Sequence, residues 1–91
     1  MTARSAVTGL MALATLPIAN AAAVDVVNED RNSYRVIIQD DRGQREMEIQ
    51  AGQSLRGICG ACSITIETDD PLEAQGAEIV QIKAGKLQIK G

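Results

Sequence analysis

The sequence predicts a small all-β domain, an antiparallel β-sandwich or barrel of about six short strands over residues 24–91, behind a cleaved signal peptide at 1–23. Three observations predict it. Apolar and polar residues alternate along short segments, as they do in half-buried strands. Turn sequences rich in Asp and Gly separate these segments at roughly 8–12-residue spacing. No segment combines a helical period with helix caps, and the alternative, a small α+β fold, would need such a helix.

The first element is the leader. Arg4 gives it a positive start, 10–16 is an apolar run, and small residues precede Val24. That order is typical of a secretory signal peptide, and the run is shorter than the roughly 20 residues that cross a bilayer. A membrane anchor and an ordinary N-terminal helix are the alternatives. Cleavage after Ala21 or Ala23 fits the pattern, so we expect a periplasmic or secreted protein that has no membrane partner after cleavage.

The first half of the domain holds three candidate strands, at 24–27, 33–39 and 44–50. A turn at 40–43 joins the second strand to the third, which makes them a β-hairpin. Alternation along the pair places five residues on the core side: Tyr34, Val36, Ile38, Met47 and Ile49.

The second half begins with a turn at Ala51–Gly52. Clear strands are expected at 63–67, 77–83 and 86–90, and a short one at 72–75 after a turn at 68–71. The last two strands carry the similar endings QIKAG and QIKG, so they are interpreted as a hairpin around Ala84–Gly85. The expected inward residues are Ile64, Ile66, Leu87 and Ile89.

Composition narrows the function. Of nine basic and 12 acidic residues only Arg4 lies in the leader, so 24–91 holds eight bases against 12 acids, a net charge of −4. Nucleic acid is therefore not an expected partner. The chain has no histidine, which removes an imidazole base and a histidine-ligated metal. We expect no catalytic residues, no cofactor and no complete metal site.

The remaining charges are interpreted as surface features. Asp40–Asp41 and Asp69–Asp70 resemble calcium ligands, but no D-x-D-x-D-G loop is present, so they are expected to be solvated turn residues. Sheet-surface and edge protection is the role expected of five other residues: Lys83, Lys86, Lys90, Glu46 and Glu48.

Cys59 and Cys62 are the only cysteines. An even number in a secreted chain favours a disulfide. In an extended strand their Cα atoms would be about 10 Å apart, whereas a disulfide needs less than about 7 Å, so Gly60–Ala61 must turn. Cys62 shares the parity of Ile64 and should point inward. The alternatives are a redox dithiol, with Cys59 the more exposed, attacking thiol and Arg56 the only nearby cation, and a metal half-site formed by the two cysteines.

The chain shows two local resemblances to known families and one general resemblance. Ser54–Cys62 resembles the loop of plant-type ferredoxins, in which Cys59 and Cys62 match two cluster ligands; Ser54 stands where the first cysteine should be and no fourth follows. Segments 27–36 and 51–55 resemble the early strands of cupredoxins, which implies a β-sandwich; the copper-ligating histidines are missing. The chain as a whole resembles small secreted proteobacterial β-proteins with a Cys-x-x-Cys motif.

Together these features predict a secreted, non-enzymatic β-module with a Cys59–Cys62 disulfide and a structural or protein-interaction role. Its contacts are expected at edge strands or an apolar patch, with a protein as partner and a monomer or weak homodimer as the solution state. The alternative is a periplasmic dithiol redox or metal-handling protein that uses Cys59 and Cys62.

Overall fold

The computed structural model describes residues 23–90, so the predicted leader lies outside the described residues apart from Ala23. Residues 23–90 form an all-β fold without a helix, and hence without one able to cross a membrane. The strands are β1 (Val24–Asn28), β2 (Tyr34–Asp40), β3 (Gly43–Ile49), β4 (Ser54–Cys59), β5 (Ala61–Ile66), β6 (Asp69–Gln75), β7 (Ile79–Lys83) and β8 (Lys86–Ile89).

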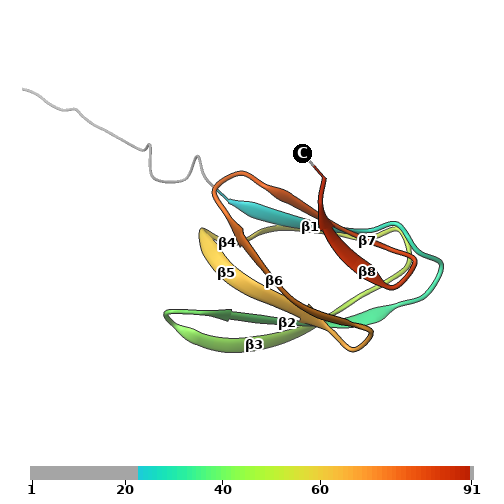
Figure 1. Cartoon of the computed structure of the whole chain (residues 1–91), viewed down its shortest axis with the longest axis horizontal. Coiled ribbons are helices and arrows are strands. Elements are labelled where there is room, and N and C mark those ends of the chain that lie inside the picture. Colours follow the sequence, from blue (N-terminus) through green and yellow to red (C-terminus); the bar gives the residue numbers. More distant parts are fainter. Residues whose placement is uncertain (1–22, 91) are drawn as a thin grey trace, which may run out of the picture.

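Two four-stranded sheets face each other as a small β-sandwich (Figure 1). The first sheet has the order β4-β1-β7-β8 and the second the order β3-β2-β5-β6. All pairs are antiparallel except β1 with β7, which run parallel. The predicted sandwich is thus confirmed, and the expectation of a purely antiparallel arrangement is wrong at this one pair, because β1 enters the sheet between two later strands.

Alternation builds the core between the sheets. The predicted inward residues of β2 and β5 are buried at 2% exposure or less, except Tyr34 at 8%. Ile49 is fully buried, and Met47 packs half-buried against the core. The core residues are Val24, Val26, Tyr34, Val36, Ile38, Ile49, Ile58, Cys59, Cys62, Ile64, Ile66, Ala74, Val80, Ile82 and Leu87.

Both predicted hairpins are confirmed. Asp40 pairs with Gly43 across the β2–β3 turn, and Lys83 pairs with Lys86 across the β7–β8 turn. Ile89 departs from its prediction, since it is 37% exposed. It has the inward parity of Leu87, but β8 is the last strand of its sheet and ends there, so too little chain covers it.

The predicted strand count of about six is too low by two. No strand was predicted between the turn at Ala51–Gly52 and residue 63, yet Ser54–Cys59 forms β4. Its exposed Arg56 and Gly57 interrupt the alternation that identifies a strand, and a register shift in the β1–β4 ladder accompanies them. The turn expected at 68–71 is shorter, because β6 already begins at Asp69 and includes Pro71.

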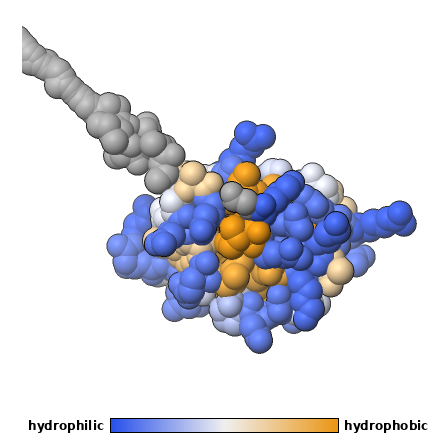
Figure 2. Space-filling model, turned by 45° about the horizontal axis from the view of Figure 1, so that its top comes forward, coloured by the Kyte–Doolittle hydropathy of each residue, from blue (hydrophilic) through white to orange (hydrophobic). Residues whose placement is uncertain are grey.

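Hydrophilic side chains cover most of the face shown in Figure 2, and a narrow band of hydrophobic residues lies between them. Ile79 and Ile89 are the exposed large hydrophobic residues among 23–90. Ile79 alternates with the buried Val80 and so belongs to the outer face, whereas Ile89 has the core-side parity. The two residues therefore do not form one apolar patch.

Candidate functional site

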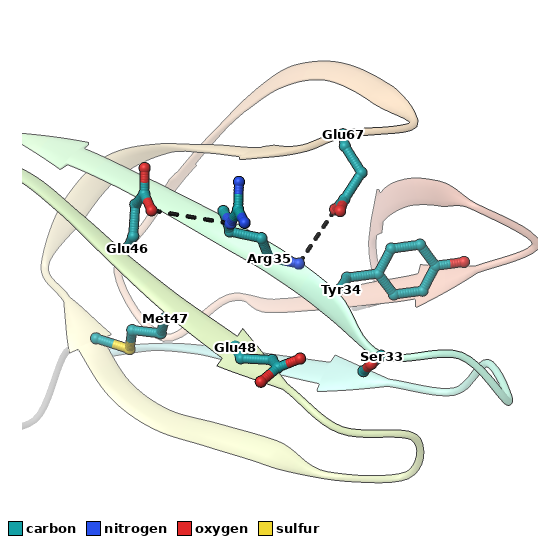
Figure 3. Close-up of a pocket in the computed structure, with 7 residues that line it drawn as sticks. All are labelled: Ser33, Tyr34, Arg35, Glu46, Met47, Glu48 and Glu67. Atoms are coloured by element: carbon teal, nitrogen blue, oxygen red, sulfur yellow. Dashed lines mark hydrogen bonds and ion pairs between the residues drawn. The ribbon is translucent and has the colours of Figure 1, made fainter.

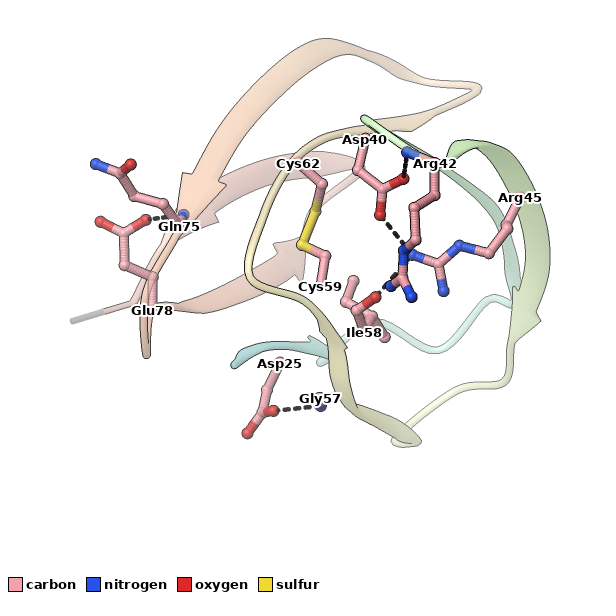
Figure 4. Close-up of a disulfide and its surroundings, with 10 residues drawn as sticks. All are labelled: Asp25, Asp40, Arg42, Arg45, Gly57, Ile58, Cys59, Cys62, Gln75 and Glu78. Carbon is pink, nitrogen blue, oxygen red and sulfur yellow. Dashed lines mark hydrogen bonds and ion pairs between the residues drawn. A yellow bond between two sulfur atoms is a disulfide. The ribbon is translucent and has the colours of Figure 1, made fainter. Parts of the chain in front are cut away.

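The candidate site lies where the chain passes from one sheet to the other. Cys59 is the last residue of β4 and pairs with Val24 in the first sheet. Cys62 lies in β5 and pairs with Ala74 in the second sheet. The disulfide between Cys59 and Cys62 therefore links the two sheets at one end of the sandwich (Figure 4).

The predicted geometry of this bond is confirmed. The two Cα atoms are 6.1 Å apart, within the range that a disulfide accepts. The chain turns at Gly60, whose carbonyl accepts a hydrogen bond from the Gly76 amide at 2.9 Å. The φ angle of Gly60 is not in the left-handed region, and a Cβ there would meet nothing within 4 Å. The turn therefore does not require glycine at position 60.

Both cysteines are buried alike, Cys59 at 6% and Cys62 at 5% exposure. The inward direction of Cys62 is confirmed. Cys59, the attacking thiol in the redox alternative, is not appreciably more exposed than Cys62, because the sharp corner turns both side chains into the space between the sheets. An attacking thiolate needs access to its target, so this burial does not favour thiol–disulfide exchange.

A cation that the sequence did not indicate, Arg45, lies beside the disulfide, whereas Arg56, the cation that the sequence indicated, is exposed on β4. Arg45 on β3 donates from Nη2 to the carbonyl of Ile58 at 2.7 Å, next to Cys59 (Figure 4). The same nitrogen lies 3.2 Å from Oδ2 of Asp40, whose side chain is only 5% exposed. Arg45 follows Asp40 closely in sequence, but nothing in the sequence places either near Cys59, because only the sheet order does so. This cation is already paired and leaves little positive field for a thiolate.

The opposite end of the sandwich holds a polar cluster. Asn28 is fully buried; its Nδ2 donates to the carbonyls of Asn32 at 2.7 Å and Gln50 at 3.1 Å. Its Oδ1 accepts from the amide of Asp30 at 2.9 Å. One amide side chain thereby joins two segments, the β1–β2 loop and the end of β3. We call Asn28 and Asp30, with the residues that hydrogen-bond to their side chains, the Asn28–Asp30 cluster.

Asp30 extends the cluster to the β7–β8 turn. Its carboxylate accepts from the Tyr34 hydroxyl at 2.7 Å and from the amides of Ala84 and Gly85 at 2.7 and 2.9 Å. The hydrogen bond from Tyr34, followed by those from Gly85 and Ala84, lowers the pKa of Asp30 below its ordinary value. The same bond raises the pKa of Tyr34, because the neutral hydroxyl is the form that donates.

The two aspartate pairs considered for calcium lie at opposite ends of the second sheet. Asp40 is engaged by Arg45, and Oδ2 of Asp69 accepts from the amide of Leu87 at 2.8 Å. The bond from Leu87, and then one from the Asp70 amide, lowers the pKa of Asp69. Within residues 23–90, no three potential metal ligands of the Cys, Asp or Glu type gather in one place.

Comparison with known proteins adds no relative: no family model matches the chain, and no curated protein or solved structure matches it. The fold and site described here therefore rest on the chain's own residues.

Proposed function

We propose that this chain is a secreted, non-enzymatic β-module that binds another protein, with Cys59–Cys62 as a structural disulfide. The observation that carries the proposal is the place of the disulfide. It is buried and joins strands of different sheets, so the oxidised pair belongs to the folded architecture. Such bonds persist in oxidising compartments, which agrees with the secretory leader predicted from the sequence.

The contacts of three aspartates support a non-enzymatic role. The carboxylates of Asp30, Asp40 and Asp69 are each engaged by main-chain amides or by a guanidinium. These groups hold turns and strand ends in place. They are thus used by the architecture, whereas a catalytic acid or base needs a free position facing a substrate.

The competing proposal, a periplasmic dithiol redox or metal-handling protein, has weaker support. Its reactive atoms would be the sulfurs of two residues that are at most 6% exposed. The neighbouring Arg45 is paired with Asp40 and does not act as a free cation for a thiolate.

The test uses the full chain with its own leader, expressed in a bacterial host and fractionated. Intact mass of the periplasmic protein, with and without reductant before alkylation, should give a chain starting at Ala22 or Val24 with both thiols masked. A full-length cytoplasmic product with two free thiols would overturn secretion and the disulfide together. Native mass of the same sample should show no metal; a retained ion would favour metal handling.

Binding of a protein is tested separately. The oxidised, folded protein is immobilised and exposed to a periplasmic extract from its own source, and bound proteins are identified after washing at physiological salt. A partner that competes with soluble protein is the expected result. Failure to retain any protein, with the immobilised module shown to be folded, would overturn the binding role.

A further inference from the structure

Four strands lie at sheet edges, namely β4, β8, β3 and β6. Unpaired amides and carbonyls on an edge can pair with a strand of another chain, and proteins commonly block them with bulges, prolines, charges or short strands. In three of the four edges the main-chain groups themselves are missing, occupied or interrupted, whereas β3 carries only charged side chains.

In the second sheet, the β6 edge is interrupted twice. Pro71 has no amide hydrogen to offer, and the amide of Gln75 donates to Oε1 of Glu78 at 2.9 Å. A strand laid along β6 would therefore find its donors missing or occupied at two positions.

In the first sheet, both edges are blocked as well. The β8 edge has four residues, and the amide of Leu87 donates to Asp69. On β4, the register shift and the left-handed φ of Gly57 mark a bulge, and Arg45 occupies the carbonyl of Ile58. Neither strand offers a continuous row of free groups.

The β3 edge differs from these three. The two-residue turn makes Asp40–Gly43 a hydrogen-bonded pair, so alternate residues of β3 bond to β2. The amides and carbonyls of Gln44, Glu46 and Glu48 consequently point away from β2, and all three residues are exposed. No hydrogen bond from these groups to other residues within 23–90 occupies the row.

The charge along this row selects its partner. Glu46 and Glu48 project on the outer side of the sheet, where a polar hollow of about 400 Å³ lies between Ser33–Arg35, Glu67 and 46–48 (Figure 3). Arg35 is the one base in that lining, and it lies 3.9 Å from Glu46. The lining thus holds three carboxylates and one guanidinium, although Glu67 already accepts a hydrogen bond from the Arg35 amide at 3.1 Å. A base on an added strand would meet unmatched negative charge.

The same charge disfavours a second copy at this edge. Antiparallel pairing of β3 with β3 of another molecule would set Glu46 opposite Glu46 or Glu48. Like charges directly opposite each other destabilise a strand pair, whereas opposite charges stabilise it. The β3 edge thus disfavours pairing with β3 of a second copy and favours a strand with Lys or Arg at alternate positions.

We propose that the β3 edge binds an extended, basic segment of another protein by strand addition. The segment places Lys or Arg opposite Glu46 and Glu48, with small or apolar residues between them on the side of Met47. Main-chain hydrogen bonds to Gln44, Glu46 and Glu48 provide affinity, and the alternate charges provide register. This inference rests on the proposed protein-binding function and names the surface and the class of its partner.

The test uses the oxidised protein labelled with ¹⁵N and a capped peptide, Lys-Val-Lys-Val-Lys-Val-Lys. We expect saturable shifts centred on β3 and amide exchange slowed at least about tenfold at Gln44, Glu46 and Glu48, because ladder bonds protect amides. A Glu-Val peptide of the same length should not bind. Absence of lysine-peptide binding at millimolar concentration, or shifts without slowed exchange at these amides, would overturn strand addition.

Two matched pairs separate strand addition from simple charge attraction. N-methylation of the lysine at peptide position 3 removes a peptide amide that faces β3 and should weaken binding at least about tenfold, whereas N-methylation of the central valine removes one that faces away. Glu48→Lys on β3 should weaken binding by a similar factor, whereas Glu73→Lys, an equal change on the exposed β6 edge, should alter it less than about twofold. Equal effects within either pair would contradict the proposal.

The outcome is distinguishable from failure of the proposed function. If the wild-type protein retains a partner from extract and Glu48→Lys retains it equally, the module binds proteins but not through β3. The wild-type protein could instead retain no partner while it binds the lysine peptide with the expected slowing of amide exchange. Strand addition at β3 would then be supported, and the proposed protein-binding function in the cell would be contradicted.

Discussion

At one end of the sandwich a disulfide joins the two sheets, whereas at the other end the Asn28–Asp30 cluster joins loops and turns by hydrogen bonds. The covalent link closes a ring of only four residues, Cys59 to Cys62. The Asp30 carboxylate instead connects positions 54 and 55 residues apart. The comparison teaches that the polar end performs the long-range closure, which sequence inspection had assigned to no residue.

The largest expected loss of stability comes from a substitution in the Asn28–Asp30 cluster. Asn28→Ala removes the amide that satisfies the carbonyls of Asn32 and Gln50 and the amide of Asp30, and it leaves a cavity. We expect a loss of about 3 kcal/mol in the free energy of unfolding. Urea denaturation measures it, with Gln88→Ala, an exposed amide, as the control expected within about 0.5 kcal/mol. A loss below about 1 kcal/mol for Asn28→Ala would contradict the view that the Asn28 side chain is central to holding this end of the sandwich together.

The next largest loss of stability is expected from removal of the disulfide. Replacing both Cys59 and Cys62 with Ala opens a four-residue ring, for which chain entropy gives about 2 kcal/mol. The variant should therefore fold, and reductant should lower the stability of the wild type but not of the variant. Denaturation of both proteins with and without reductant measures this. Complete unfolding of the reduced wild type would show that the disulfide matters more than the polar end.

Substitution of two glycines, Gly85 in the β7–β8 turn and Gly60 in the disulfide turn, compares the two ends of the sandwich. Gly85 has a φ of 73°, and a Cβ there would lie 3.3 Å from Oγ1 of Thr68, whereas Gly60 has ordinary φ and open space. Gly85→Ala should cost about 1–2 kcal/mol, and Gly60→Ala less than about 0.5 kcal/mol. Thermal denaturation distinguishes them, since 1 kcal/mol shifts Tm by about 4–8 °C in a domain of this size. Equal shifts would contradict the assigned geometry.

Acid should lower the stability of the protein through the aspartates at the polar end of the sandwich. The pKa values of Asp30 and Asp69 are lowered from 3.8, so below about pH 4 the unfolded chain binds more protons than the folded one. Their contribution is fully present above the unfolded pKa and is lost as pH falls through the folded pKa. Asp30→Asn should flatten the fall in stability below about pH 4, measured by urea denaturation across pH. A slope equal to that of the wild type would contradict this.

A smaller effect isolates one hydrogen bond. Because the Tyr34 hydroxyl is the largest cause of the lowered pKa of Asp30, Tyr34→Phe should move that pKa back toward 3.8. Carboxyl-carbon NMR of Asp30 over an acid titration measures the change. The amides of Ala84 and Gly85 remain in the variant, so a partial return is expected. An unchanged pKa would assign the shift to the turn amides alone.

Most of the fold could be predicted because alternation is a local signal. Val36, Ile38, Ile64 and Ile66 follow it and are buried. β4 was missed because its bulge breaks the pattern, and the parallel β1–β7 pair was missed because strand order is not encoded in local periodicity. The disulfide geometry followed from the spacing of the two cysteines and from the reach of a disulfide.

The rest of the site depends on tertiary neighbours. Asn28 is polar and flanks a predicted strand, so its sequence context indicates a turn residue, yet it is fully buried. Arg45 and Asp30 are ordinary surface types in sequence and gain their roles from groups far along the chain. A signal existed only for Tyr34, whose inward parity left its hydroxyl in need of a partner.

The parallel pairing of β1 with β7 also sets an order of events for the newly made chain. Val26 pairs with Val80, so β1, one of the two inner strands of the first sheet, gains its second neighbour only after most of the chain has been synthesised. Such late, non-local pairing is slow to form. The first sheet therefore stays incomplete during most of the synthesis of the chain, and closes only once β7 has been made.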